Sequence, residues 1–199
     1  MNTHLLAQLN QSEPGATVIL RDLEQQFTFE QVNRLCDGLG KILLQEKVSL
    51  LALHAENGPL WVVADLVCQR MNICLVPLPT FFSPLQLKGV LAHCHVDALL
   101  TDNPEGLNAL VDQTDQLKVL ESGLMLCKVK EQCGLVPSIP LIPENTGKIT
   151  FTSGSTGAAK GVCLSNEQLL SQARVLKEVV DIPSPRHLCL LPLSTLLEN

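Results

Sequence analysis

The sequence has no tyrosine, one tryptophan and five phenylalanines among its 199 residues. Proteins that bind single-stranded nucleic acid stack the bases on aromatic side chains, so this scarcity argues against that class. Basic side chains are also in the minority, because 14 lysines and arginines stand against 20 acidic residues and give a net charge of −6. We therefore expect no nucleic-acid partner. The acidic balance mainly favours solubility.

Long apolar runs are missing as well. The longest one, residues 60–68, is interrupted by Asp65 and is too short to cross a bilayer. The first four residues, Met1 to His4, lack the basic start and the apolar stretch of a signal peptide. We therefore expect no transmembrane segment and a cytoplasmic location.

The eight cysteines form no Cys-x-x-Cys pair, and most of them lie inside apolar runs such as Val67-Cys68. This distribution predicts buried free thiols in a reducing compartment rather than a disulfide framework. The segment His93-Cys94-His95 is the one candidate metal motif, but no second pair of ligands stands at metal spacing. We therefore expect no metal bound by these residues.

The overall composition is that of a globular domain. Apolar residues make up 46% of the chain and charged residues 17%, and the 12 glycines and 12 prolines are close to average usage. A chain of this length can bury a substantial core. These values exclude a disordered chain, a collagen-like chain and a low-complexity linker.

Strand and helix patterns alternate along the chain. Short apolar runs bounded by turn residues predict strands at 17–20, 27–29, 48–54, 73–76, 98–101, 148–152 and 162–164. Apolar stripes at helical spacing predict helices after Thr28, over 60–71, after Ser83, and from Ser165 to about Val180. This order predicts a layered α/β fold with a largely parallel sheet flanked by helices.

Three of the predicted helices have clear start signals. Two are capping boxes, Thr28 with Gln31 and Ser165 with Gln168, and the third is Ser83 as N-cap ahead of Pro84. The apolar face of the helix after Ser83 is predicted to be Leu85, Leu87, Val90 and Leu91. Residues 102–129 are less regular and predict a weaker helix with one or two strands, and the prolines within 130–147 predict an irregular connector.

The segment from Ser153 to Gly161 holds three glycines, three hydroxyl side chains and one lysine, Lys160, and it joins two predicted strands. Glycines let a backbone approach an anion, and successive N–H groups can then converge on phosphate oxygens. Hydroxyl groups add donors, and a lysine adds a compact positive charge. The composition therefore indicates a phosphate-binding loop.

Three other interpretations of this segment are a Walker P-loop, a hydrolase nucleophile and a flexible surface loop. A Walker P-loop needs a second glycine where Ala159 stands and a helix after the lysine, and a strand is predicted there instead. The same strand argues against Ser153 or Ser155 as a hydrolase nucleophile, which would need a strand-to-helix turn. Composition alone also fits a flexible surface loop rich in small residues.

His54, at a predicted strand end, is read as a partly buried structural residue rather than a base.

Residues 152–162, Thr-Ser-Gly-Ser-Thr-Gly-Ala-Ala-Lys-Gly-Val, resemble the signature loop of the adenylate-forming ligases, the superfamily of acyl-CoA synthetases, luciferases and peptide-synthetase adenylation domains. Four further segments resemble motifs of this family in the same order, so the likeness spans nearly the whole chain: 27–32, 57–66, 76–79 and 191–195. Three positions depart from the family pattern: Ala159 replaces a proline, and Asn166 and Thr195 each replace a histidine.

The resemblance implies a fold and an activity. The fold would be the N-terminal part of the large domain of an adenylate-forming enzyme. The activity would be ATP-dependent activation of a carboxylate as acyl-AMP, followed by transfer to a thiol, most often that of coenzyme A. The cofactors would then be ATP, Mg²⁺ and coenzyme A. A fatty acid is the first candidate substrate, with an aryl or amino acid as the alternative.

The resemblance also implies roles for individual residues. Thr152, Ser153, Ser155, Thr156 and Lys160 would hold the β- and γ-phosphates beside Mg²⁺. Gly154 and Gly157, together with Gly161, would let the backbone approach them. A non-catalytic nucleotide-binding or scaffold module that retains this loop is the alternative function.

The family motifs expected after the Leu-Pro-Leu segment do not occur before Asn199. We therefore expect residues 1–199 to be the N-terminal subdomain of a longer ligase, with no complete set of catalytic residues. A few hydrogen bonds from one loop barely offset the cost of association and of ordering the loop. On its own the chain is expected to be inactive and to bind ATP weakly or not at all.

Overall fold

The computed structural model describes residues 15–103, 114–120, 123–129, 142–152, 160–180 and 186–195. It opens with a small antiparallel hairpin, β1 (Val18–Arg21) and β2 (Gln26–Thr28), which leads directly into helix α2 (Phe29–Gln45). The Thr28 hydroxyl accepts the N–H of Gln31, and the Gln31 side chain accepts the N–H of Thr28. The predicted hairpin, capping box and helix are thus confirmed.

Three parallel strands form the centre of the main sheet: β3 (Leu50–His54), β4 (Cys74–Pro77) and β5 (Ala98–Thr101). Strand β3 lies between the other two and pairs in parallel with both. Helix α3 (Pro59–Met71) connects β3 to β4, and helix α4 (Pro84–Cys94) connects β4 to β5. Two successive strand–helix–strand units therefore build the predicted α/β fold.

Four more strands extend this sheet on both sides. Antiparallel β7 (Met125–Val129) and β6 (Thr114–Val119) follow β5, while β8 (Thr146–Thr152) lies parallel to β4 and pairs with antiparallel β9 (Lys160–Ser165). In the described part of the chain the order is β6-β7-β5-β3-β4-β8-β9. The parallel strands thus occupy the centre, where helices can cover both faces, and the antiparallel strands form the edges.

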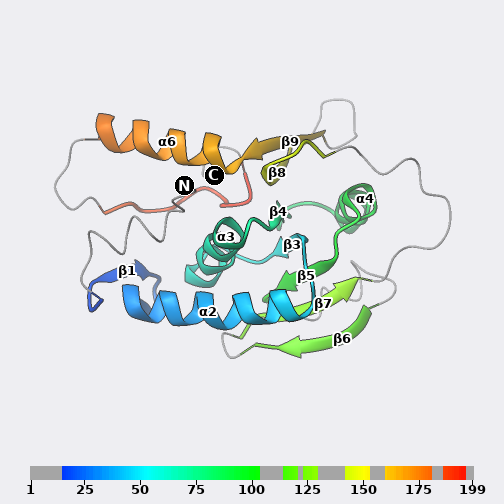
Figure 1. Cartoon of the computed structure of the whole chain (residues 1–199), viewed down its shortest axis with the longest axis horizontal. Coiled ribbons are helices and arrows are strands. Elements are labelled where there is room, and N and C mark those ends of the chain that lie inside the picture. The colour runs from blue at the N-terminus through cyan, green and yellow to red at the C-terminus, as the bar shows by residue number, and fades with distance from the viewer. Residues whose placement is uncertain are drawn as a thin grey trace.

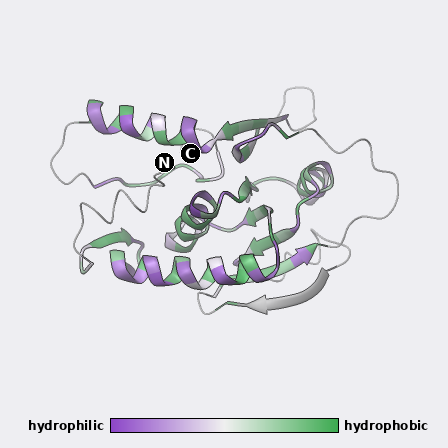
Figure 2. Ribbon diagram, viewed as in Figure 1, coloured by the Kyte–Doolittle hydropathy of each residue, from purple (hydrophilic) through white to green (hydrophobic). Residues whose placement is uncertain are grey.

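The sheet separates the core into two clusters of buried residues. Helices α2 and α3 lie on one of its faces and α4 lies on the other (Figure 1). Residues of α2 and α3 pack with Leu51 and Leu53 of β3, and residues of α4 pack with Ala52 of the same strand. Figure 2 shows the matching pattern, with apolar colour on the central strands and mixed colour along the helices. The near-continuous apolar run of β3 therefore fills both clusters by alternation.

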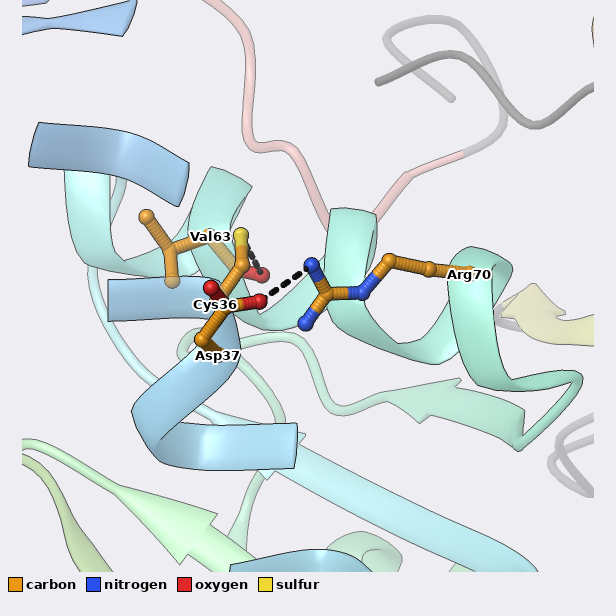
Figure 3. Close-up of polar contacts among 4 residues, drawn as sticks. All are labelled: Cys36, Asp37, Val63 and Arg70. Atoms are coloured by element: carbon orange, nitrogen blue, oxygen red, sulfur yellow. Dashed lines mark hydrogen bonds and ion pairs between the residues drawn. The ribbon is translucent and has the colours of Figure 1, made fainter. Parts of the chain in front are cut away.

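Helices α2 and α3 approach each other closely where α2 carries Gly40. A Cβ at this position would lie 3.0 Å from the Met71 sulfur and 3.3 Å from Arg70 Nη2. One turn earlier, the Cys36 thiol lies 3.9 Å from the Val63 carbonyl oxygen, and Arg70 pairs with Asp37 at 2.8 Å (Figure 3). Burial raises the pKa of Cys36 to about 11. These contacts hold α2 against α3.

The apolar face predicted for α4 is wrong at one residue. Leu87, Val90 and Leu91 are buried, but Leu85 is 82% exposed. The buried residues follow the i, i+3, i+4 spacing of one helix face, whereas two residues along a helix is a rotation of about 200°. Leu85 therefore points away from the stripe that begins at Leu87.

The end of the chain contains helix α6 (Asn166–Val179), which begins at the predicted Ser165–Gln168 capping box. No residue of α6 is buried. Residues 186–195 form no strand, although 191–195 resemble a family strand end. Between 102 and 129 two strands are present as predicted, and residues 104–113 lie outside the described residues.

Candidate functional site

Strands β8 and β9 flank the glycine-rich segment. Thr152 ends β8, Lys160 begins β9, and the two residues pair directly opposite each other. The Thr152 hydroxyl lies 3.5 Å from the Lys160 carbonyl oxygen, within donating range, and both residues are exposed. The two predicted strands that flank residues 153–159 are confirmed. Strand β9, which begins at Lys160, matches neither a Walker P-loop nor a nucleophile elbow, because both of these lead into a helix.

The structure describes two of the seven predicted site residues, Thr152 and Lys160. Ser153, Gly154, Ser155, Thr156 and Gly157 lie outside the described residues. Side chains alternate along a strand, so Thr152 lies on the same sheet face as Lys148, and its partner Lys160 shares that face. The hydroxyl of Thr152 and the ammonium group of Lys160, both on exposed residues, form a donor set that fits an anionic ligand.

Gly161 has a packing role that sequence reasoning missed. A Cβ added there would lie 3.0 Å from Ile149 Cγ2 and 3.1 Å from the Phe151 ring. Ile149 and Phe151 are both buried in the cluster under α4. Gly161, one residue after Lys160, therefore lets the β9 backbone lie in close contact with these two side chains.

The carboxyl ends of the parallel strands meet at the sheet edge where β8 also ends. His54 ends β3 and Thr101 ends β5, and ligands of open α/β sheets bind at this edge. The Asp102 carboxylate accepts the Glu56 N–H at 2.9 Å. His54 is half-buried, and this desolvation lowers its pKa, although the negative charges of Asp102 and Glu56 act to raise it. The partial burial predicted for His54 is thus confirmed, while its structural role stays a prediction.

Asn57 joins two of the family-like segments, 57–66 and 191–195. Its amide nitrogen donates to the Leu191 carbonyl at 2.7 Å, and its amide oxygen accepts the Leu193 N–H at 2.9 Å. The Thr195 hydroxyl donates to the Pro192 carbonyl at 2.8 Å and closes a turn. The Asn57 side chain thus holds the last described segment at the carboxyl edge of the sheet.

Asn166, which stands at a family histidine position, lies at the far end of the β8–β9 hairpin. It occupies the space that a Cβ on Gly147 would fill, and its amide nitrogen lies 3.5 Å from the Asn72 side-chain oxygen. Asn72 is the left-handed C-cap of α3. Asn166 therefore contacts α3 from the start of α6.

Sequence reasoning also missed a buried ion pair between β8 and α3. Lys148 Nζ lies 3.0 Å from Asp65 Oδ1 and 3.1 Å from Oδ2, and it lies 5.7 Å from the centre of the Trp61 ring. Lys148 is 2% exposed. A signal was present in the sequence, because Asp65 interrupts an apolar helix and Lys148 starts an apolar strand. Charged residues in such runs are rarely buried unless they are paired.

The cysteines follow the predicted pattern in part. Cys36, Cys68, Cys74 and Cys94 are buried free thiols, Cys127 is buried as well, Cys163 is exposed and Cys189 is half-buried. Cys94 of the His-Cys-His segment lies in the cluster under α4, and burial raises its pKa to about 12. Among the described residues no group of three or more His, Cys, Asp or Glu side chains is placed to hold a metal ion.

A family comparison covers almost the whole chain. The model of the AMP-binding enzyme family matches residues 6–198. The chain belongs to this family. The resemblance to the adenylate-forming ligases that the loop and its flanking motifs carry is thereby confirmed.

Among curated proteins, long-chain-fatty-acid–CoA ligase 5 of Rattus norvegicus is 26% identical over 209 residues, covering 86% of this chain and 30% of that protein. The hybrid PKS-NRPS synthetase pydA of an Acremonium species is 28% identical over 170 residues, covering 83% of this chain and 4% of that protein. The chain thus spans less than a third of the length of these relatives.

Solved structures confirm the fold. The o-succinylbenzoate CoA synthetase MenE from Bacillus subtilis, in complex with the acyl-adenylate intermediate OSB-AMP, matches with a TM-score of 0.70 at 20% identity. This match covers 95% of this chain and 49% of that one. VinN matches with a TM-score of 0.74 at 18% identity, covering 96% of this chain and 50% of that one.

In the described part of the chain, no helix is both long and apolar enough to span a membrane.

Proposed function

We propose that this chain supplies the triphosphate-binding part of a ligase that activates a carboxylate with ATP. The observation that carries the proposal is the placement of Thr152 and Lys160. They lie opposite each other at the carboxyl edge of the sheet and flank a glycine- and hydroxyl-rich segment in a chain of the AMP-binding enzyme family. One structure of the neighbour MenE is a complex with ATP and a magnesium ion, which supports ATP and Mg²⁺ as the ligands.

In the proposed reaction a carboxylate oxygen attacks the α-phosphorus of ATP. A bond forms between this oxygen and the α-phosphorus, and the bond from the α-phosphorus to the oxygen that bridges it to the β-phosphate breaks. Pyrophosphate leaves with that bridging oxygen, and acyl-AMP results. A thiol, for which we propose coenzyme A, then attacks the acyl carbonyl carbon and displaces AMP. In this scheme Lys160 and the hydroxyls of Thr152, Ser153, Ser155 and Thr156 bind the β- and γ-phosphates and stabilise the charge that develops on the leaving group. Gly154 and Gly157 let the backbone approach them.

For the substrate we propose a fatty acid. Two kinds of relative support this choice: long-chain-fatty-acid–CoA ligases at 22–26% identity and a long chain acyl-CoA synthetase of Arabidopsis thaliana at 28% identity. The aryl or amino acid alternative has its own support in MenE, which was solved with an o-succinylbenzoyl adenylate, and in VinN, which was solved with L-aspartate. A panel of one fatty acid, one aryl acid and one amino acid separates these classes.

We further propose that residues 1–199 act as the N-terminal subdomain of a longer ligase domain and are inactive alone. The share of the relatives that the chain covers supports this. So do the apolar side chains that are exposed in α6 and in residues 186–195: Val175, Leu176, Val179, Leu188 and Leu190. A cytoplasmic location is part of the proposal and is supported by the free thiols of Cys36, Cys68, Cys74 and Cys94.

The test is carboxylate-dependent exchange of labelled pyrophosphate into ATP by the longest form of the protein that its gene encodes. The double variant T156A/K160A is expected to lower the exchange at least 100-fold, because it removes a donor and a cation from the developing pyrophosphate. The variant K41A, an exposed lysine on α2, is the matched control and should keep the exchange rate. Full exchange by T156A/K160A would contradict the proposal, and ATP binding without any exchange would favour the non-catalytic module.

A further inference from the structure

The ion pair between Asp65 and Lys148 stands out because it is charged and almost fully enclosed. Both carboxylate oxygens of Asp65 lie within 3.1 Å of the Lys148 ammonium group, and the face of Trp61 lies beside it. The side chains are 17% and 3% exposed. Moving two charges out of water is costly, and replacing such a pair by apolar residues is often neutral or stabilising. Stability alone therefore does not explain why these two charged residues are here.

The pair lies at the junction between two parts of the fold. Strand β8 pairs with β9 at six positions, and β9 leads into α6, so these three elements form one continuous unit. On its other side β8 meets the parallel sheet in the register Leu75 opposite Lys148. The residue in register with β4 is thus also the one that binds α3 through Asp65.

Lys148 also shares a sheet face with the proposed phosphate-binding residues. Thr152 follows four residues later on β8, at about 3.3 Å per residue, and Lys160 pairs with Thr152 on β9. Strand β8 is continuous from Lys148 to Thr152, so a displacement of Lys148 relative to α3 would displace Thr152 and its partner Lys160 as well.

We propose that Asp65 and Lys148 are positioning residues of the nucleotide site. Their ion pair fixes β8 against α3, and it thereby places Thr152 and Lys160 relative to the carboxyl ends of β3 and β5. This inference rests on the proposed function for the ligand, but the junction itself is a property of the fold. It predicts that losing the pair impairs ATP binding beyond any effect on folding.

The test compares K148M, D65N and the double variant D65N/K148M in the longest form of the protein that its gene encodes. The matched control is D37N, which breaks the exposed Asp37–Arg70 pair between α2 and α3. For each variant the thermal midpoint is measured first. KM for ATP, KM for the carboxylate and the exchange rate at saturation are then measured well below that midpoint.

We expect K148M and D65N to raise KM for ATP at least tenfold, with KM for the carboxylate changed less than threefold. The double variant should recover the thermal midpoint, because no unpaired charge remains buried, but its KM for ATP should stay raised. A purely structural pair would give the opposite result, with KM for ATP returning to the unmodified value once stability returns. That outcome overturns the inference, as does an unchanged KM for ATP in the folded single variants.

Hydrogen exchange separates this inference from the proposed function. K148M should lose amide protection in β8 and β9 while β3 keeps its own. If this occurs in a protein that shows no pyrophosphate exchange, the proposed function fails and the junction stands. If exchange is normal and β8 and β9 stay protected in K148M, the inference fails and the proposed function stands.

Discussion

Helix α3 forms one ion pair with α2 and another with β8, and the two pairs differ in how far water reaches them. On the α2 side Arg70 and Asp37 meet at 2.8 Å with 23% and 60% of their side chains exposed (Figure 3). On the β8 side Lys148 and Asp65 meet at 3.0 Å with 3% and 17% exposed. The separations are alike, but water screens the first pair and hardly reaches the second. Burial, rather than distance, thus decides what each pair contributes.

The same contrast holds for the regions around the pairs. The α2–α3 side is a packed layer in which Cys36, Leu39 and Leu43 are buried and Gly40 allows close contact. The β8–β9–α6 side has a helix with no buried residue and an edge strand whose first four residues are exposed. One side is therefore held by many apolar contacts, and the other depends on fewer and more specific ones.

The largest effect is expected for the buried pair. Lys148→Met leaves the Asp65 carboxylate enclosed without its cation and should lower the free energy of unfolding of the chain by about 3–5 kcal/mol. The double variant D65N/K148M should come within about 1 kcal/mol of the original chain, because neither charge then remains. Denaturant unfolding of the four proteins of this cycle measures the coupling. Equal losses in the single and double variants would contradict a coupled pair.

An intermediate effect is expected for the two helix caps. Thr28→Ala and Ser165→Ala each remove a capping hydroxyl and should cost about 1 kcal/mol. Because α2 belongs to the core and α6 buries no residue, Thr28→Ala should lower the global unfolding midpoint, and Ser165→Ala should mainly increase amide exchange within α6. Thr28→Ser and Ser165→Thr are the controls that retain a hydroxyl. A larger global loss from Ser165→Ala would reverse the comparison of the two sides.

The smallest effect is expected for the exposed pair. Asp37→Asn should change the free energy of unfolding by less than about 1 kcal/mol, and 1 M salt should remove most of that difference. Arg70→Met is the complementary variant and should additionally raise the pKa of Cys36, since the Arg70 charge lowers it. Thermal unfolding at low and high salt measures the first effect, and alkylation rates against pH measure the second. A loss as large as that of Lys148→Met would show that burial does not distinguish the pairs.

The elements that the sequence predicted well are those governed by neighbouring residues. The three helix starts at Thr28, Ser83 and Ser165 rest on hydrogen bonds within three or four residues, and all three are present. Leu85 was misassigned because an apolar residue near a helix start does not reveal which face will be covered. Lys148 was missed because its partner, Asp65, lies 83 residues away in the chain.

The candidate site was predicted in the same uneven way. The glycine-rich segment and its flanking strands could be found from residues 148–164, because the glycines, hydroxyls and lysine that suggest a phosphate-binding loop are neighbours in the chain. The packing of Gly161 on Phe151 and the contacts of Asn57 with Leu191 and Leu193 could not be found this way. They depend on which strands become neighbours and on where the last segment returns to the sheet.

By itself the sequence determined the alternation of strands and helices, the caps and the family, since all of these are local patterns or ordered motifs. Only the tertiary structure decided that β8 lies beside β4, that Lys148 pairs with Asp65 beside the Trp61 ring, and that α6 has no buried residue. Such outcomes depend on long-range pairing, where the free energy of burial is shared among residues far apart in the chain.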